Sequence, residues 1–218
     1  MDWLVLQLTD SAFPSGGFAH SAGLEAAHAW GDVTCARDVE RFARDAVWQA
    51  GAGALPFVRA AAERRFDEAD RACDAFLVGT VSNRASRTQG RALAATAGRV
   101  FDANEAVVAL ARVASEREAF AHLAPVFGVV TAALGVAARA AQEMFLYTTL
   151  RQTLSAAVRL GLVGPHEAQS IQHASREVLD EVLAACASRG LGEASQTAPL
   201  LELTANLHDG LYARLFQS

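Results

Sequence analysis

The chain has 218 residues, a net charge of −5 and a hydrophobic fraction of 52%, and it contains only five prolines. This composition excludes disordered and fibrous proteins, and the acidic balance leaves no basic footprint for nucleic acid or for an anionic membrane surface. Because of this acidic charge, we expect the partners of the chain to be proteins. A chain of this length suits one domain that buries about 70–75% of its unfolded surface.

Strand signals are almost absent, because the chain has a single isoleucine and no Asn-Gly hairpin turn. We therefore predict an all-α fold, a single-domain helical bundle of about ten helices over residues 1–218. In the first half, capping residues and apolar periodicity predict helices at residues 3–8, 22–30, 35–53, 67–78 and 82–101. A further helix is expected to begin at Pro56.

In the second half, Pro125 opens an apolar helix inside the uncharged run 123–138. That run is shorter than the ~18–20 apolar residues of a membrane-spanning helix, so we predict a buried central helix and no membrane partner. A long helix is expected over residues 138–160, and one continuous helix from Pro165 to Gly190. Pro199 then introduces a leucine-rich tail, residues 199–218.

The three cysteines, Cys35, Cys73 and Cys186, are odd in number and far apart. They therefore form neither a disulfide framework nor a CxxC metal knuckle, which fits a reducing, cytoplasmic location. The first residues also lack the positive segment of a signal peptide.

The most distinctive stretch is residues 9–25, TDSAFPSGGFAHSAGLE, for which we expect a shaped loop between two helices. Pro14 fixes its own φ, and Gly16 and Gly17 can adopt positive φ, so the chain turns sharply there. Ser21 is a candidate N-cap for a helix that begins at Ala22.

The residues argue against a phosphate-binding loop and favour a structural turn or a loop that contacts a partner, because GxxxxGK[ST] is absent and the chain has no lysine. Asp10, His20, Glu25 and His28 lie within twenty residues, so a small helical enzyme that uses this loop is one alternative. No GxSxG or HExxH motif accompanies them. We therefore predict no catalytic residue and expect Asp10 and Ser11 to satisfy backbone groups in the loop.

Arginines at two further positions are candidates for a binding role. Arg84, Arg87 and Arg91 form one basic helix face, which is either a solvated face or a binding surface. Arg159 follows apolar residues, so its charge must pair with a carboxylate or lie at an interface.

The histidines do not predict a metal site. His166 and His173 share a helix but are separated by about 10.5 Å along its axis, too far to chelate one ion. His20 and His208 have no second ligand nearby in sequence. We predict no metal site within the chain and no cofactor.

Residues 6–25 closely resemble the N-terminal signature of the urease accessory protein F family (UreF), which reads much like LQLxDSxFPxGGFxHSxGLE. Four further segments also resemble this family. They are Ser-x-x-Gln-Gly at residues 86–90 and the stretches at residues 122–135, 156–169 and 208–218. The chain departs from the family at Leu162–Pro165, where Pro-Leu-Gly-Gln is usual, and at Asp209, where Glu is usual.

The resemblance implies a non-enzymatic, all-α homodimer that acts with urease accessory proteins D/H and G to load nickel into apo-urease. In the family, the C-terminal tail helps to hold the D/H protein, and the dimer presents a surface to the GTPase G. Two regions are of interest for partner binding. One is residues 1–24, which contain the N-terminal helix and the glycine loop, and the other is the tail, residues 199–218. The predicted partner-binding residues are Ser15, Gly16, Gly17, His20, Arg84, Arg87, Gln89, Arg159, His208, Tyr212, Arg214 and Phe216.

Two expectations accompany this prediction. Tyr212, Leu215 and Phe216 give the tail more apolar and aromatic surface than a free end leaves in water, so it should contact a partner while its removal exposes little of the core. The alternative to an adaptor is a regulator that acts on the GTPase's catalysis through Arg84, Arg87, Arg91 or Arg159.

Overall fold

Helices joined by short connections make up the computed structural model, which describes residues 2–116 and 118–218. No β-strand occurs in these residues, so the all-α, single-domain prediction is confirmed. The α-helices are α1 (Trp3–Thr9), α2 (Leu24–Ala29), α3 (Ala36–Gly53), α4 (Leu55–Ala62), α5 (Phe66–Phe76), α6 (Thr80–Val100), α7 (Glu105–Ser115), α8 (Leu123–Ala133), α9 (Ala138–Arg159), α10 (Pro165–Ala174), α11 (Arg176–Cys186) and α12 (Pro199–Asn206). The 3-10 helices are η1 (Gly17–Ala19), η2 (Leu191–Glu193) and η3 (Leu207–Gly210).

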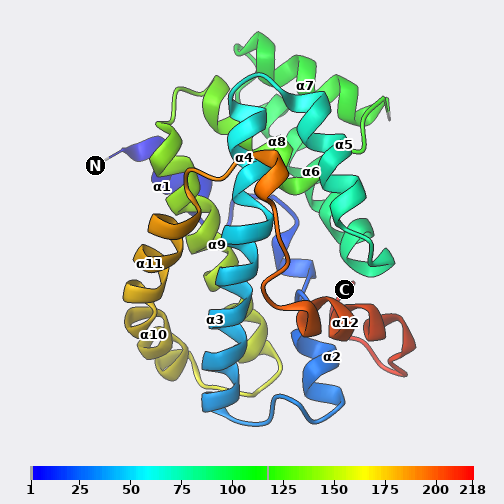
Figure 1. Ribbon diagram of the computed structural model, residues 1–218, viewed down its shortest axis with the longest axis vertical. Helices are drawn as coiled ribbons and strands as arrows, with labels where there is room; N and C mark the ends of the chain where they lie inside the picture. The colour runs from blue at the N-terminus through cyan, green and yellow to red at the C-terminus, as the bar shows by residue number, and fades with distance from the viewer. Residues whose placement is uncertain (1, 117) are drawn as a thin grey trace.

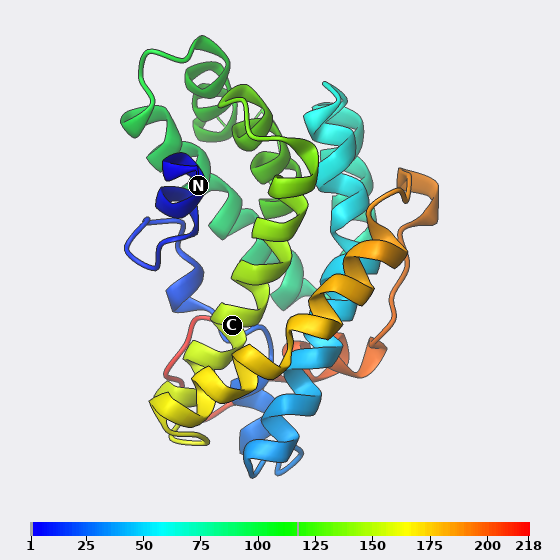
Figure 2. The ribbon, with the colours of Figure 1, turned by 90° about the vertical axis from the view of Figure 1, so that its left-hand side faces the viewer.

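The core lies where α3, α4, α8 and α9 pack on one another (Figures 1 and 2). Helix α8 is apolar on almost every face and is buried along most of its length, as predicted. It packs closely against α4, and the absence of a side chain on Gly128 permits this contact. A Cβ on Gly128 would lie 2.1 Å from the carbonyl oxygen of Val58. No helix in the described ranges is long and apolar enough to cross a membrane.

Two helix predictions need correction. The expected continuous helix after Pro165 breaks at Ser175, which ends α10 and precedes α11. The Ser175 hydroxyl donates to the carbonyl oxygen of Ile171 at 2.8 Å, a bond that commonly bends helices. Helix α7 was not expected, although Asn104 caps it by accepting a hydrogen bond from the amide of Val107 at 3.2 Å.

The tail folds back beside α2 and α6 (Figure 1). Helix α12 packs on both of these helices, and η3 follows it along α2. Residues 211–218 then return to the glycine loop, residues 10–23, through backbone hydrogen bonds such as Gln217 N to Ala19 O at 2.8 Å. The fold thus places the family-like N-terminal and C-terminal stretches at one junction.

Candidate partner-binding site at the glycine loop and tail

The glycine loop closes against helices α6 and α9. Gly16 has a φ of +78°, and the hydroxyl of Thr96 on α6 donates to the carbonyl oxygen of Pro14 at 2.8 Å. A Cβ on Gly17 would lie 1.6 Å from Nε2 of Gln152 on α9. Gly16 therefore adopts the positive φ expected for a sharp turn, whereas Gly17 does not, and the absence of a side chain on Gly17 permits close contact with α9.

Side chains within the loop satisfy its backbone. Asp10 Oδ1 accepts a hydrogen bond from the amide of Ala12 at 2.7 Å, as expected for this residue. The helix predicted to start at Ala22 starts instead at Leu24, because Ala22 and Gly23 both adopt positive φ. The predicted cap position was therefore wrong, although the Ser21 hydroxyl still accepts from the amide of Glu25 at 3.3 Å.

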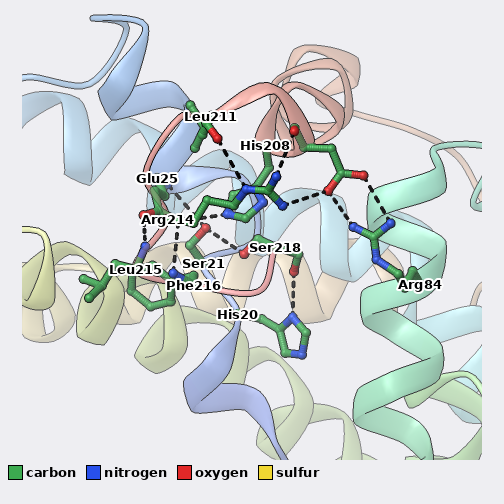
Figure 3. A network of polar contacts seen from close by, with 11 residues as sticks. His20, Ser21, Glu25, Arg84, His208, Leu211, Arg214, Leu215, Phe216 and Ser218 are labelled. Carbon is green, nitrogen blue, oxygen red and sulfur yellow. Dashed lines mark hydrogen bonds and ion pairs between the residues drawn. The ribbon is translucent and has the colours of Figure 1, made fainter.

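Glu25 of α2 holds the tail (Figure 3). The residue is only 6% exposed, and Oε2 accepts hydrogen bonds from His208 Nε2 at 2.8 Å and from the amide of Phe216 at 3.1 Å. Oε1 accepts from the amide of Leu215. One buried carboxylate is thus matched by three donors from the tail, which is how a buried charge is tolerated.

Ser218 forms the second attachment of the tail (Figure 3). Its carbonyl oxygen accepts from the Ser21 amide at 2.6 Å and from the Ser21 hydroxyl at 2.9 Å. Its hydroxyl lies 2.6 Å from Nδ1 of His20. Burial, with the nearby His208 and Arg84, lowers the pKa of His20 to about 4, so its ring is neutral at pH 7.

Arg84 joins α6 to the tail. Its guanidinium donates to both carboxylate oxygens of Asp209, at 2.8 and 3.2 Å. Arg214 contacts the same carboxylate at 3.5 Å and donates to the Asp209 carbonyl oxygen at 3.0 Å. The Arg84 hydrogen bond lowers the pKa of Asp209. Because these side chains are about half exposed, the pair contributes little stability and mainly orients the tail.

Arg159 lies between two aromatic rings at the end of α9. Its guanidinium is 3.8 Å from the centroid of Phe18 and 4.2 Å from that of Phe216, and it donates to the carbonyl oxygen of Phe18. Within the described ranges it forms no ion pair, so the carboxylate partner considered from the sequence is not found. Arg159 instead connects the glycine loop to the tail by cation–π contacts.

The tail has a buried side and an exposed side. Phe216 is 5% exposed and belongs to the core, so the expectation that tail removal exposes little of the core is wrong. Tyr212 is fully exposed. The leucine-rich tail predicted from the sequence also forms an apolar row on α12 and η3 with i, i+3, i+7 spacing, although these leucines were not among the predicted partner-binding residues. This row is Leu200 (73% exposed), Leu203 (62%) and Leu207.

The remaining predicted residues differ in accessibility. Gln89 on α6 is buried, as are His20 and His208, whereas Ser15 is half-buried. The guanidinium of Arg87 lies 5.2 Å from the ring centroid of Phe120. The structure therefore gathers the predicted loop and tail residues around one junction and leaves Arg87 and Gln89 on the neighbouring helix.

A buried cluster of polar side chains connects α6 to its neighbouring helices. His122 lies between the Ser86 hydroxyl, 3.1 Å from Nδ1, and the Asp74 carboxylate, 3.0 Å from Nε2. Asp70 accepts from the amides of Ala121 and His122 at 3.0 and 2.8 Å. The His122 side chain is wholly buried, so this serine–histidine–aspartate arrangement joins α5, α6 and α8 and offers the imidazole no route to a substrate.

The loop residues of the enzyme alternative have separate partners. Asp10 binds the loop backbone, His20 binds Ser218, and Glu25 binds the tail. His28 Nδ1 lies 2.9 Å from the carbonyl oxygen of Val33. Among the described residues, no group of three His, Cys, Asp or Glu side chains is placed to hold a metal ion.

Comparison with known proteins covers almost the whole chain. The family model described as UreF matches residues 33–176. Urease accessory protein F of Arabidopsis thaliana is 39% identical over 100% of this chain and 93% of its own length. Its namesake in Oryza sativa subsp. indica is 35% identical over 98% of this chain and 84% of its own length. Urease accessory protein UreF of Mycobacterium tuberculosis is 32% identical over 99% of this chain and 98% of its own length.

Proposed function

Since the chain belongs to the urease accessory protein F family, we propose that it is a cytoplasmic, non-enzymatic adaptor in the maturation of the urease nickel centre. As a homodimer, it would bridge urease accessory protein D/H and the GTPase G, so that nickel reaches apo-urease. Nickel is the cargo of this assembly, and the adaptor's contribution is to hold its partners together.

The observation that carries the proposal is the two-sided tail. Its inner side is fixed to the body by Glu25 and by the burial of Phe216. Its outer side presents Leu200, Leu203 and Leu207 to solvent, with Tyr212 nearby in sequence. An exposed apolar row on an element that is firmly held by polar contacts is typical of a protein interface. We assign this outer side to the D/H protein.

The glycine loop supports the second contact, with the GTPase. Phe18 is 69% exposed and is held in place by Arg159, so a large aromatic ring is presented in a fixed position. Aromatic residues and arginine are enriched at interface hot spots. The loop and the tail share the Arg159 contact, which would let one adaptor hold both partners.

A surface for a second copy of the chain is available on α1. Trp3 and Leu6, one helical turn apart, are 78% and 47% exposed. A tryptophan this exposed on a short, largely apolar helix favours association. Light scattering on the purified chain and on a Trp3→Glu variant tests this assignment, because loss of a dimer in the variant supports it and an unchanged mass contradicts it.

The regulator alternative receives less support. A catalytic arginine must extend into a partner's active site, whereas Arg84 is paired with Asp209 and Arg159 lies between two rings. The guanidinium of Arg87 is placed over Phe120. GTP turnover by the partner, measured with and without this chain, distinguishes the two functions: an adaptor leaves the intrinsic rate unchanged.

Co-purification with the D/H protein and the GTPase is the direct test. We expect Leu203→Asp to abolish capture of the D/H protein and to leave the melting temperature unchanged, because the side chain is exposed. Val108→Asp is the matched control, since Val108 is an exposed apolar residue on α7 outside the tail. Normal capture by Leu203→Asp would contradict the assignment of this surface.

A further inference from the structure

A cavity of about 360 Å³ lies between the glycine loop and α9. The loop contributes residues 11–20, and α9 contributes Arg151, Gln152, Ser155 and Arg159. No aspartate or glutamate lines it. Two guanidinium groups without an acidic neighbour are unexpected in a chain whose net charge is −5, and they make the cavity locally positive.

Arg151 has no partner that explains its position. Its side chain is half-buried, its Nε is completely buried, and no described residue gives it a hydrogen bond or an ion pair. In contrast, Arg59, Arg65 and Arg139 each pair with a carboxylate three or four positions later in the chain. Because buried polar groups are almost always hydrogen-bonded, the buried Nε of Arg151 indicates a missing acceptor.

The neighbouring groups favour a carboxylate as that acceptor. Gln152 and Ser155 line the cavity with amide and hydroxyl donors, and Arg159 adds a second positive charge about 12 Å further along the helix axis. Arginine binds planar carboxylates through two parallel hydrogen bonds.

We propose that this cavity binds a carboxylate group, held mainly by Arg151. The carboxylate belongs either to a small free acid or to an aspartate or glutamate side chain of the GTPase, and only the second source rests on the proposed function.

The first experiment tests carboxylate binding by the isolated chain. Acetate is titrated into ¹⁵N-labelled protein, with chloride at equal ionic strength as the reference for screening. We expect saturable shifts of the Gly16 and Gly17 amides and of the Gln152 side-chain amide. Arg151→Gln should weaken acetate binding tenfold or more. Arg139→Gln, which removes the same charge from the same helix outside the cavity, should bind acetate like the original chain.

The absence of saturable shifts would overturn the proposal, and so would equal weakening in the two variants. The second experiment identifies the source of the carboxylate by capture of the GTPase. Loss of capture in Arg151→Gln, together with competition by acetate, assigns the carboxylate to the partner's side chain. Acetate binding with unchanged capture assigns it to a free acid. Capture without acetate binding overturns the carboxylate site and leaves the adaptor function standing.

Discussion

Replacing Glu25 by glutamine should release the tail while the helical body stays folded. The change preserves the size of the side chain and removes its charge. At present the carboxylate accepts hydrogen bonds from His208 Nε2 and from the amides of Leu215 and Phe216. A glutamine offers one acceptor oxygen, so its amide group must face at least one of these donors.

The size of the effect follows from these contacts. A hydrogen bond to a charged group contributes about 1.5–3 kcal/mol, and a buried donor left without an acceptor costs about 1–3 kcal/mol. Because water can reach the released tail and offset part of this, we expect the attachment to weaken by about 2–3 kcal/mol. The opening equilibrium of the tail should then increase roughly 30- to 150-fold.

Hydrogen–deuterium exchange measures this opening directly. Amides of residues 211–218 should exchange faster by that factor, while those of α4 and α8 report on the body. Glu143→Gln is the control, because Glu143 forms an exposed ion pair with Arg139 and should change stability by less than about 0.5 kcal/mol. Unchanged exchange of the tail in Glu25→Gln, or an equal increase in tail and body, would refute the reasoning.

Three further predictions concern the packing, the pH response and the tail. Gly90→Ala should lower the free energy of unfolding by about 1–3 kcal/mol, since its Cβ would lie 2.0 Å from the Ala121 carbonyl oxygen; denaturant titration beside Gly192→Ala, where the space is open, checks this. The pKa of His20 is lowered to about 4, so unfolded chains take up a proton near pH 6.5 that folded chains accept only near pH 4. The free energy of unfolding should therefore fall as the pH is lowered through this window, and His20→Gln should flatten that part of the profile. Deleting residues 211–218 should destabilise the whole chain, because it uncovers the site of Phe216 and leaves Glu25 buried without its backbone donors; a truncated chain that melts like the full one would contradict this.

The sequence by itself determined the fold class, most helix positions and the family. These depend on local signals: the 3.6-residue periodicity of α3, the unbroken apolar run of α8, and the turn at Gly16 and Gly17. Each acts over a few residues and can be recognised without knowing what packs against it. The break at Ser175 was missed because a single hydroxyl decides between a bent and a straight helix.

Only the tertiary structure decided which groups meet. In the sequence Glu25 stood out only beside Asp10, His20 and His28, yet its carboxylate binds tail residues about 190 positions later in the chain. Phe216 and Tyr212 look equally suited to a partner in the sequence, but one is in the core and the other is in solvent. Arg159 was expected either to pair with a carboxylate or to lie at an interface, and its guanidinium lies between two rings within the chain. Such pairings depend on how distant helices pack, because burial and hydrogen bonding are properties of the assembled surfaces and not of the local pattern.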